Sequence, residues 1–260
     1  MLMEIFIDTA DVAEIREACS WGIVDGLTTN PSLIRKAVEA RHQDQIDMAN
    51  YIEEICRLVD GPVSLEVISL SCDAMVDEAI KLHQRFYPVH QNVVIKIPVN
   101  TSNEDGACPG FEGLKAIREL ASRGIDINAT LIMTAEQALL CAKAGARYVS
   151  PFMGRVDDYE ISLSESAIRE SNVPSAGCDL VRSIAQIFRQ YSFDCSVIAA
   201  SIRSISHVRC AEIAGAEIAT IPLTILKEMT AHAKTAEGVR RFSNDIVPEY
   251  SQLFDSLTVL

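Results

Sequence analysis

The sequence predicts one α/β domain that folds as a closed (β/α)8 barrel, because short apolar runs alternate eight times with longer segments of helical periodicity. Strands that alternate with helices pair in parallel, and eight such units can close a barrel. The chain length of 260 residues suits a single domain of this type. An open doubly wound sheet is the alternative, and the lack of a G-x-G-x-x-G motif after the first apolar run disfavours it.

The expected strands are short and rich in β-branched residues, a composition typical of parallel strands that are buried on both faces. We place them at Ile5–Ile7, Ile23–Thr28, Val63–Ile68, Val93–Val99, Ile125–Ile132, Tyr148–Ser150, Val197–Ala200 and Ile218–Ile221.

The segments between these strands carry end signals of helices. Thr134, followed three residues later by Gln137, has the pattern of a capping box, which opens a helix. Gly145 and Gly215 each stand between two alanines just before a strand, where a glycine commonly ends a helix. We therefore expect one domain over residues 1–260, in which residues 233–260 form a C-terminal helical extension.

Composition and charge exclude several classes of protein. The formal net charge of −13 disfavours binding to nucleic acids and to anionic membranes, so an anion site must be a local basic cluster. No apolar run approaches the length of a membrane span, and the N-terminal residues lack a secretory signal pattern. The eight cysteines lack the spacing of a zinc site, so we expect buried free thiols in a reducing cytoplasm.

Lys96 is the most informative residue, because it interrupts the otherwise apolar run Val93–Val99. A lysine is rarely buried without a reason, and burial favours the neutral, nucleophilic amine over the ammonium ion. A lysine on a buried strand is therefore a candidate for Schiff-base formation with a carbonyl substrate. The alternative is a lysine near a strand end that reaches water or pairs with a carboxylate.

Polar side chains stand at the C-terminal ends of nearly all the other expected strands, which is the end of a barrel where catalytic groups gather. They are Asp8, Thr29, Asn30, Glu66, Asn128, Thr130, Ser150, Arg155, Ser201 and Arg203. Each one alone has a structural explanation: a helix cap, a turn, a strand residue, or, for Arg155, a surface ion pair with Asp157 or Asp158. Their convergence around one strand lysine favours an active site.

Six motifs, in order along the chain, resemble those of the transaldolase family. They are Ile7-Asp8-Thr9-Ala10, Thr28-Thr29-Asn30-Pro31-Ser32, Val94-Ile95-Lys96-Ile97-Pro98, Asn128-Ala129-Thr130-Leu131, Ser150-Pro151-Phe152-Met153-Gly154-Arg155 and Ala200-Ser201-Ile202-Arg203. The match spans residues 3 to 230 and is loose from residue 233 onward.

The resemblance implies a TIM barrel of the class I aldolase type, in which Lys96 forms a Schiff base with a ketose phosphate. It implies that Asp8 takes the proton of the C4 hydroxyl, and that Glu66 moves protons through a water held by Thr130. No metal or organic cofactor is expected, because the iminium itself is the electron sink. The implied activity moves a dihydroxyacetone unit from fructose 6-phosphate or sedoheptulose 7-phosphate to erythrose 4-phosphate or glyceraldehyde 3-phosphate, in the pentose phosphate pathway.

Two binding regions are also implied. The hydroxyls of the three-carbon unit would contact Thr29, Asn30, Asn128 and Ser150, with Phe152 as a wall that keeps water from the intermediate. The phosphate would bind Arg155, Ser201 and Arg203 beside the start of a helix near Ser204.

Glu66 and Phe152 favour transfer over simple cleavage, because the related fructose-6-phosphate aldolases carry glutamine and tyrosine at these positions. Three alternatives stay open: a fructose-6-phosphate aldolase, a transaldolase for another anionic sugar such as a sulfosugar, and a non-catalytic barrel that binds sugar phosphates. The segments 100–110 and 156–175 look longer than in short members of the family. As loops at the active-site face they would shape acceptor choice or contacts within a homo-oligomer, and we expect small sugar phosphates as the other partners.

Overall fold

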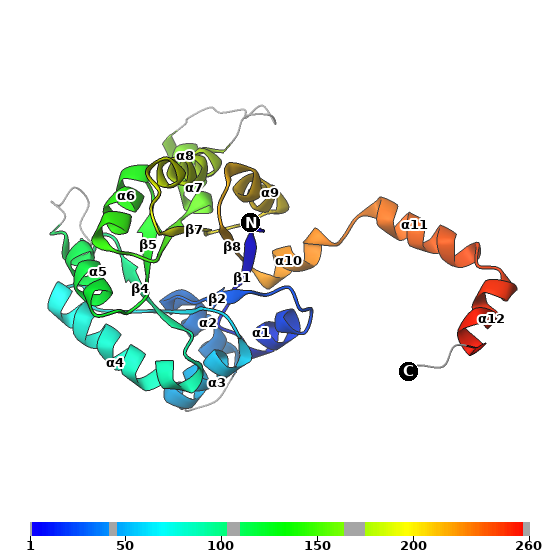
Figure 1. Ribbon diagram of the computed structural model, residues 1–260, viewed down its shortest axis with the longest axis horizontal. Coiled ribbons are helices and arrows are strands. Elements are labelled where there is room, and N and C mark those ends of the chain that lie inside the picture. Colours follow the sequence, from blue (N-terminus) through cyan, green and yellow to red (C-terminus); the bar gives the residue numbers. More distant parts are fainter. Residues whose placement is uncertain (1, 42–45, 103–109, 164–174, 257–260) are drawn as a thin grey trace. The chain divides into compact units, whose positions relative to one another are not determined.

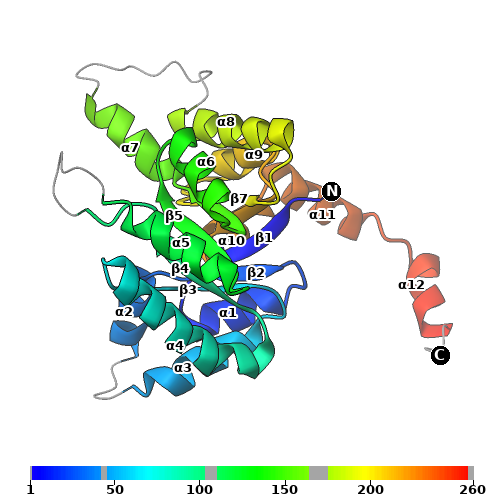
Figure 2. The same ribbon diagram turned by 60° about the vertical axis from the view of Figure 1, so that its left-hand side comes forward.

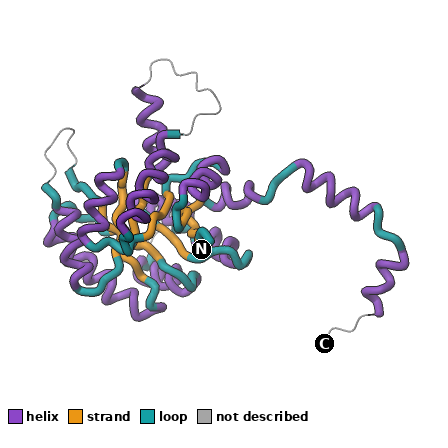
Figure 3. The backbone as a smooth tube through the Cα atoms, turned by 45° about the horizontal axis from the view of Figure 1, so that its top comes forward, coloured by secondary structure: helices purple, strands orange, loops and turns teal. Residues whose placement is uncertain are grey.

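The computed structural model describes residues 2–41, 46–102, 110–163 and 175–256. Eight parallel strands of these residues pair in sequence order, and the first also pairs with the eighth. The sheet is therefore a closed barrel, which confirms the predicted fold, and helices surround the strands (Figures 1 and 3). In the turned view of Figure 2, helices α4, α5 and α6 follow one another around the outside of the barrel.

The strands are β1 (Glu4–Asp8), β2 (Gly26–Thr28), β3 (Val63–Glu66), β4 (Val93–Pro98), β5 (Ile127–Ile132), β6 (Tyr148–Pro151), β7 (Ser196–Ala199) and β8 (Ile218–Ile221). The helices are α1 (Val12–Cys19), α2 (Pro31–Ala40), α3 (Met48–Leu58), α4 (Cys72–His90), α5 (Glu112–Ser122), α6 (Ala135–Ala144), α7 (Met153–Leu163), α8 (Ala176–Tyr191), α9 (Ile205–Ala214), α10 (Leu223–Met229), α11 (Ala233–Asn244) and α12 (Pro248–Ser256).

Four strands are shorter than predicted: the fourth ends at Pro98 instead of Val99, the fifth begins at Ile127 instead of Ile125, and in the second and third an apolar residue at the expected end is exposed. The second strand begins at Gly26 instead of Ile23, whose side chain is 46% exposed. The third ends at Glu66 instead of Ile68, which is 77% exposed and whose backbone N–H binds the carboxylate of Glu78. The predictions for the second and third strands relied on apolar character alone and so included apolar residues that belong to loops.

The predicted helix ends are confirmed. Thr134 and Gln137 form a reciprocal capping box at the start of α6. Gly145 ends α6 with a φ of 106° and Gly215 ends α9 with a φ of 91°, a left-handed conformation that disfavours any residue with a Cβ.

The expected long loop at 156–175 is wrong in its first part, because residues 156–163 belong to α7. The backbone N–H of Val156 donates to the carbonyl of Phe152, so the helix starts directly after the strand. Asp157 then holds α7 against α8 through the backbone N–H of Gly177. Residues 164–174, like residues 103–109 of the other long segment, lie outside the described residues.

The cysteines are mostly as predicted. Cys56, Cys72, Cys141 and Cys195 are buried free thiols, and Cys19 is free and partly exposed. Cys178 of α8 and Cys210 of α9 depart from the prediction: a disulfide joins them, because the packing of these two helices brings their Cα atoms to 5.9 Å. Cys108 lies outside the described residues.

The chain divides into two compact units, Met1–Ile225 and Leu226–Leu260. The first contains the whole barrel and the packed apolar layer between strands and helices. In the second, α11 and α12 are helical as expected, and none of the residues of α11 is buried. That both units belong to one domain stays a prediction. Within the described residues, no helix has the length and apolar character needed to cross a membrane.

Candidate active site

Lys96 lies inside the barrel, with its side chain only 4% exposed. Its Nζ donates to the backbone carbonyl of Thr29 at 3.0 Å and lies 3.2 Å from Oε2 of Glu66. The carboxylate partner considered as an alternative explanation is therefore present, but it meets the lysine inside the barrel and not in water. An amine placed here is shielded from solvent and close to one proton acceptor.

The strand register explains why these side chains meet. In the pairing of β3 with β4, Glu66 is level with Lys96, and in that of β4 with β5, Lys96 is level with Asn128. Residues at the same level of neighbouring strands share a face of the sheet. A lysine on β4 is thus placed between a carboxylate and a carboxamide by the pairing alone.

Asp8, at the end of β1, faces the same interior. Its Oδ1 accepts a hydrogen bond of 2.8 Å from the hydroxyl of Thr28, which in turn lies 2.5 Å from the hydroxyl of Thr220. Burial raises the pKa of Asp8 above its ordinary value of 3.8, while the positive charge of Lys96 and the bond from Thr28 act in the opposite direction. A carboxyl group with a raised pKa can both accept and return a proton near neutral pH.

Sequence reasoning missed both threonines as site residues. The only available signal was a hydroxyl on a strand whose other side chains are apolar, and threonine is common in strands for its shape alone.

A chain of hydrogen bonds crosses the barrel interior beside the lysine. Asn128 Nδ2 donates to the hydroxyl of Ser64 at 3.0 Å, and the hydroxyl of Ser150 donates to Asn128 Oδ1 at 2.7 Å. These three side chains are at most 1% exposed. Asn128 and Ser150 are therefore held in fixed orientations, and Ser64 is a further residue that sequence reasoning missed.

Thr29 and Asn30 follow β2, and both have a structural role that their sequence did not reveal. The hydroxyl of Thr29 donates to the carbonyl of Ser64 at 2.7 Å, while its own carbonyl accepts from Lys96. Asn30 Oδ1 caps α2 by accepting from the backbone N–H of Leu33. The amide nitrogen of Asn30 remains as the part that can contact a ligand.

Thr130 has a fully buried hydroxyl that has no hydrogen-bond partner among the described residues. Next to it, Leu131 has a left-handed φ of 58°, and the pairing of β5 with β6 shifts register between Ala129 and Ile132. Such a bulge redirects side chains, and a left-handed leucine stores strain of about 1 kcal/mol. A buried hydroxyl without a partner is a natural position for a bound water or substrate group.

Phe152 and Arg155 follow β6. The ring centre of Phe152 lies 5.9 Å from Nζ of Lys96 and 5.2 Å from the guanidinium of Arg155, so the ring is near both cations. The alternative pairing of Arg155 with Asp157 or Asp158 is not formed. Asp157 lies 3.1 Å from His207, and Asp158 lies 2.5 Å from the guanidinium of Arg203.

Arg203 and Ser201 follow β7 and lie against the start of α7. Gly154 permits this approach, because a Cβ on it would stand 2.5 Å from the carbonyl of Ser201 and 2.6 Å from Nε of Arg203. The hydroxyl of Ser204 caps the following helix, α9. The predicted phosphate residues are thus brought to one region by two consecutive strand–helix junctions.

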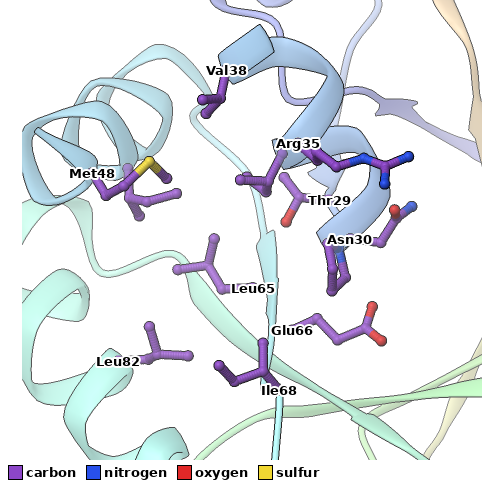
Figure 4. Close-up of a pocket in the computed structure, with 12 residues that line it drawn as sticks. Thr29, Asn30, Arg35, Val38, Met48, Leu65, Glu66, Ile68 and Leu82 are labelled. Atoms are coloured by element: carbon purple, nitrogen blue, oxygen red, sulfur yellow. The ribbon is translucent and has the colours of Figure 1, made fainter. Parts of the chain in front are cut away.

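A pocket of about 360 Å³ lies at another part of the barrel, beside Thr29, Asn30 and Glu66 (Figure 4). Its walls are largely apolar and come from α2, α3, β3 and α4. In Figure 4, Glu66 and Asn30 project to one side of β3, whereas Leu65 projects to the other side, toward Leu82. Lys96 is not among the lining residues, so Glu66 stands at the boundary between this pocket and the barrel interior. No cluster of metal-ligating side chains was found in the part of the chain that the structure describes.

Comparison with known proteins identifies the family of this chain. The sequence profile of the family "Transaldolase/Fructose-6-phosphate aldolase" matches residues 5–257. The chain belongs to this family. A protein of Caldicellulosiruptor saccharolyticus named "Probable transaldolase" is 48% identical over 244 residues, which cover 94% of this chain and 96% of the relative. Proteins of the same name from Clostridium perfringens and Symbiobacterium thermophilum are each 44% identical over 243 residues, covering 94% of this chain and 97% and 96% of the relatives. The expected membership of the transaldolase family is confirmed.

Asp8→Asn should stabilise the protein at pH 7. Because the pKa of Asp8 is raised in the folded state, the folded protein binds this proton more tightly than the unfolded chain, and ionisation destabilises the fold above about pH 4. We expect a higher free energy of unfolding than wild type in urea at pH 7, and a smaller difference as the pH falls toward 4. Asp11→Asn, which neutralises the neighbouring α1 cap, is the control. An Asp8→Asn variant without any gain at pH 7 would contradict the raised pKa.

Proposed function

We propose that this protein is a transaldolase, which transfers a dihydroxyacetone unit between sugar phosphates through a Schiff base on Lys96. The observation that carries the proposal is the shielded amine of Lys96, placed 3.2 Å from Glu66 at a barrel end that also holds the raised-pKa Asp8. The family is that of transaldolases and fructose-6-phosphate aldolases, and the relatives carry the name "Probable transaldolase".

The first half of the reaction forms and uses an iminium. Lys96 passes a proton to Glu66, attacks the carbonyl carbon of the ketose phosphate, and the carbinolamine loses water. Electrons of the C3–C4 bond then flow into the iminium as Asp8 takes the proton of the C4 hydroxyl. The aldose phosphate leaves, and a three-carbon enamine stays on Lys96.

The second half reverses these steps with a different aldehyde, and Asp8 now returns the proton. The partnerless hydroxyl of Thr130 supports a role in holding the water through which Glu66 exchanges protons with the carbinolamine. Asn128, Ser150 and the amide of Asn30 bind the hydroxyls of the three-carbon unit. Phe152 keeps water away from the enamine.

The phosphate group binds at Arg155, Ser201 and Arg203. Two guanidinium groups beside the start of α9 offer fork-shaped donors and the positive end of a helix dipole. The net charge of −13 makes such a local cluster necessary for an anionic substrate. The sugars of the pentose phosphate pathway fit this chemistry, and we propose them as donors and acceptors.

We also propose that the chain forms a homo-oligomer in a reducing, cytoplasmic setting. Five of the seven described cysteines are free thiols, which supports the compartment, whereas the disulfide between Cys178 and Cys210 is unusual for it. The C-terminal unit supports the oligomer, because α11 and α12 expose large apolar side chains such as Phe242, Tyr250 and Phe254, at 71%, 58% and 59%. Exposed apolar groups of this size usually mark a contact surface.

Lys96→Ala should abolish both turnover and covalent trapping by borohydride with fructose 6-phosphate, because no other amine occupies this position. Lys115→Ala, which removes an exposed lysine of α5, should leave trapping intact. The measurement is the mass of the reduced adduct and the peptide that carries it. An adduct on another lysine, or trapping that survives in Lys96→Ala, would refute the mechanism.

Arg155→Ala and Arg203→Ala should each raise KM for fructose 6-phosphate by roughly 10- to 100-fold, from the loss of charge-assisted hydrogen bonds. The concentration of dihydroxyacetone needed for trapping should change far less, because it has no phosphate. Arg147→Ala is the matched control, because Arg147 precedes β6 at the opposite end of the barrel and pairs with Asp194. Equal losses for both ligands would point to a structural role.

Phe152→Tyr should release dihydroxyacetone from fructose 6-phosphate when no acceptor aldehyde is present. The added hydroxyl would orient a water or relay a proton to the enamine carbon, and Glu66→Gln should enhance the effect, because both residues adjoin Lys96. Phe193→Tyr adds the same hydroxyl elsewhere and should have no effect. If Phe152→Tyr transfers normally and releases no free dihydroxyacetone, the residue does not exclude water and the choice of transaldolase over aldolase loses its physical basis.

The oligomer is tested by sedimentation equilibrium of the full chain. We expect a mass above 28.5 kDa for wild type and a smaller mass for Phe242→Glu, because a charge on the exposed face of α11 opposes its burial. Tyr191→Glu, an equally exposed site on α8, is the control. A monomeric wild-type protein would end the proposal.

A further inference from the structure

Asp157 is a buried carboxylate that joins three helices next to the proposed phosphate region. It lies on α7, its residue is 7% exposed, and its Oδ1 accepts a hydrogen bond of 3.0 Å from the backbone N–H of Gly177 on α8. Its Oδ2 lies 3.1 Å from Nε2 of His207 on α9. A carboxylate so little exposed is retained only with partners such as these.

His207 extends this contact to the loop after β7. Its Nδ1 accepts a hydrogen bond of 3.4 Å from the backbone N–H of Arg203. An imidazole nitrogen that accepts carries no proton, so the ring proton is on Nε2 and faces Asp157. One imidazole therefore connects α7 to the backbone of Arg203, and its side chain is only 15% exposed.

Both proposed phosphate-binding arginines are tied to this pair. Arg155 stands two residues before Asp157 on α7, and Arg203 is held through His207. The close approach of Gly154 to Ser201 and Arg203 leaves little room for the two segments to shift independently. The contact between Asp157 and His207 thus places the backbone of Arg203 relative to α7 and Arg155, while the guanidinium of Arg203 also pairs with Asp158 of the same helix.

We propose that His207 is a positioning residue for phosphate recognition, acting with Asp157 to set the placement of Arg203 relative to Arg155. This inference rests on the proposed phosphate site and adds to it a residue that does not touch the substrate. Neither residue carried a functional signal in the sequence, because a histidine inside a helix and an aspartate after an arginine are both ordinary surface patterns.

The test compares two ligands that share a carbonyl and differ in the phosphate. Borohydride trapping of the full-length protein gives the half-saturating concentrations of fructose 6-phosphate and of dihydroxyacetone. His207→Leu should raise the first by about 3- to 10-fold, the loss typical of one hydrogen bond, and leave the second within about twofold. His207→Gln should recover at least half of the loss, since its amide offers one donor and one acceptor.

Two further variants separate positioning from general structure. His90→Leu breaks another histidine–aspartate contact, in which His90 at the end of α4 lies 3.5 Å from Asp60 after α3, and should affect neither ligand selectively. In an Arg203→Ala background, His207→Leu should add little, because residues that act through one another are not additive. If His207→Leu fails to fold by circular dichroism, Asp157→Asn and His207→Gln should still show a smaller selective shift.

The outcomes distinguish this inference from the proposed function. A loss from His207→Leu that is equal for both ligands, or that persists unchanged with Arg203→Ala, overturns the positioning role and leaves the phosphate site standing. An Arg203→Ala variant with no selective loss of fructose 6-phosphate refutes the phosphate site itself, and the role of His207 with it. A selective and non-additive loss that His207→Gln restores supports the inference.

Discussion

The site depends on keeping one amine out of water. Removing Lys96 from solvent would be strongly unfavourable if the ammonium had no partner, and the barrel supplies the carbonyl of Thr29 and the carboxylate of Glu66 at 3.0 and 3.2 Å. Asp8 adds a second buried acid, so two carboxyl groups share one cation. Burial raises the pKa of Asp8 by more than the charge of Lys96 lowers it. The carboxyl group of Asp8 can therefore take up and release a proton.

Apolar and polar side chains occupy different levels along the strands of the barrel. The lower part of the barrel interior is apolar: Phe6 and Ile218 lie two residues before Asp8 and Thr220 and share their face, and Ile198 is level with Ile218. Toward the carboxyl ends of the strands the interior becomes polar, and each polar side chain there needs a partner. Ser64, Asn128 and Ser150 satisfy one another, whereas the hydroxyl of Thr130 does not. The hydrogen-bonded side chains of Ser64, Asn128 and Ser150 are held rigidly, and the hydroxyl of Thr130 remains available to a ligand group.

The barrel and most of the candidate site could be predicted from the sequence, because most of the apolar runs that form strands end at or just before a polar residue of the candidate site. Lys96 stood out because a charge inside a β-branched run has few structural explanations. Thr28 and Thr220 did not, since they meet across 192 residues and each is an ordinary strand residue. The left-handed Leu131 gave no signal either, because leucine has no preference for that conformation. Contacts such as Asp157 with His207 exist only once three helices have packed, so they depend on tertiary structure that local patterns do not encode.

The ion pair of Arg203 with Asp158 has a kinetic consequence. Both side chains are about half exposed, at 49% and 56%, so the pair is weak and opens readily. An anion that binds Arg203 displaces a carboxylate tethered nearby, and the same carboxylate returns at high effective concentration as the anion departs. Binding is then an exchange of counter-ions instead of the capture of a bare cation. If the proposed phosphate site is correct, such an exchange would shorten the residence time of a bound sugar phosphate, as the proposed two-step transfer requires between the first product and the next aldehyde.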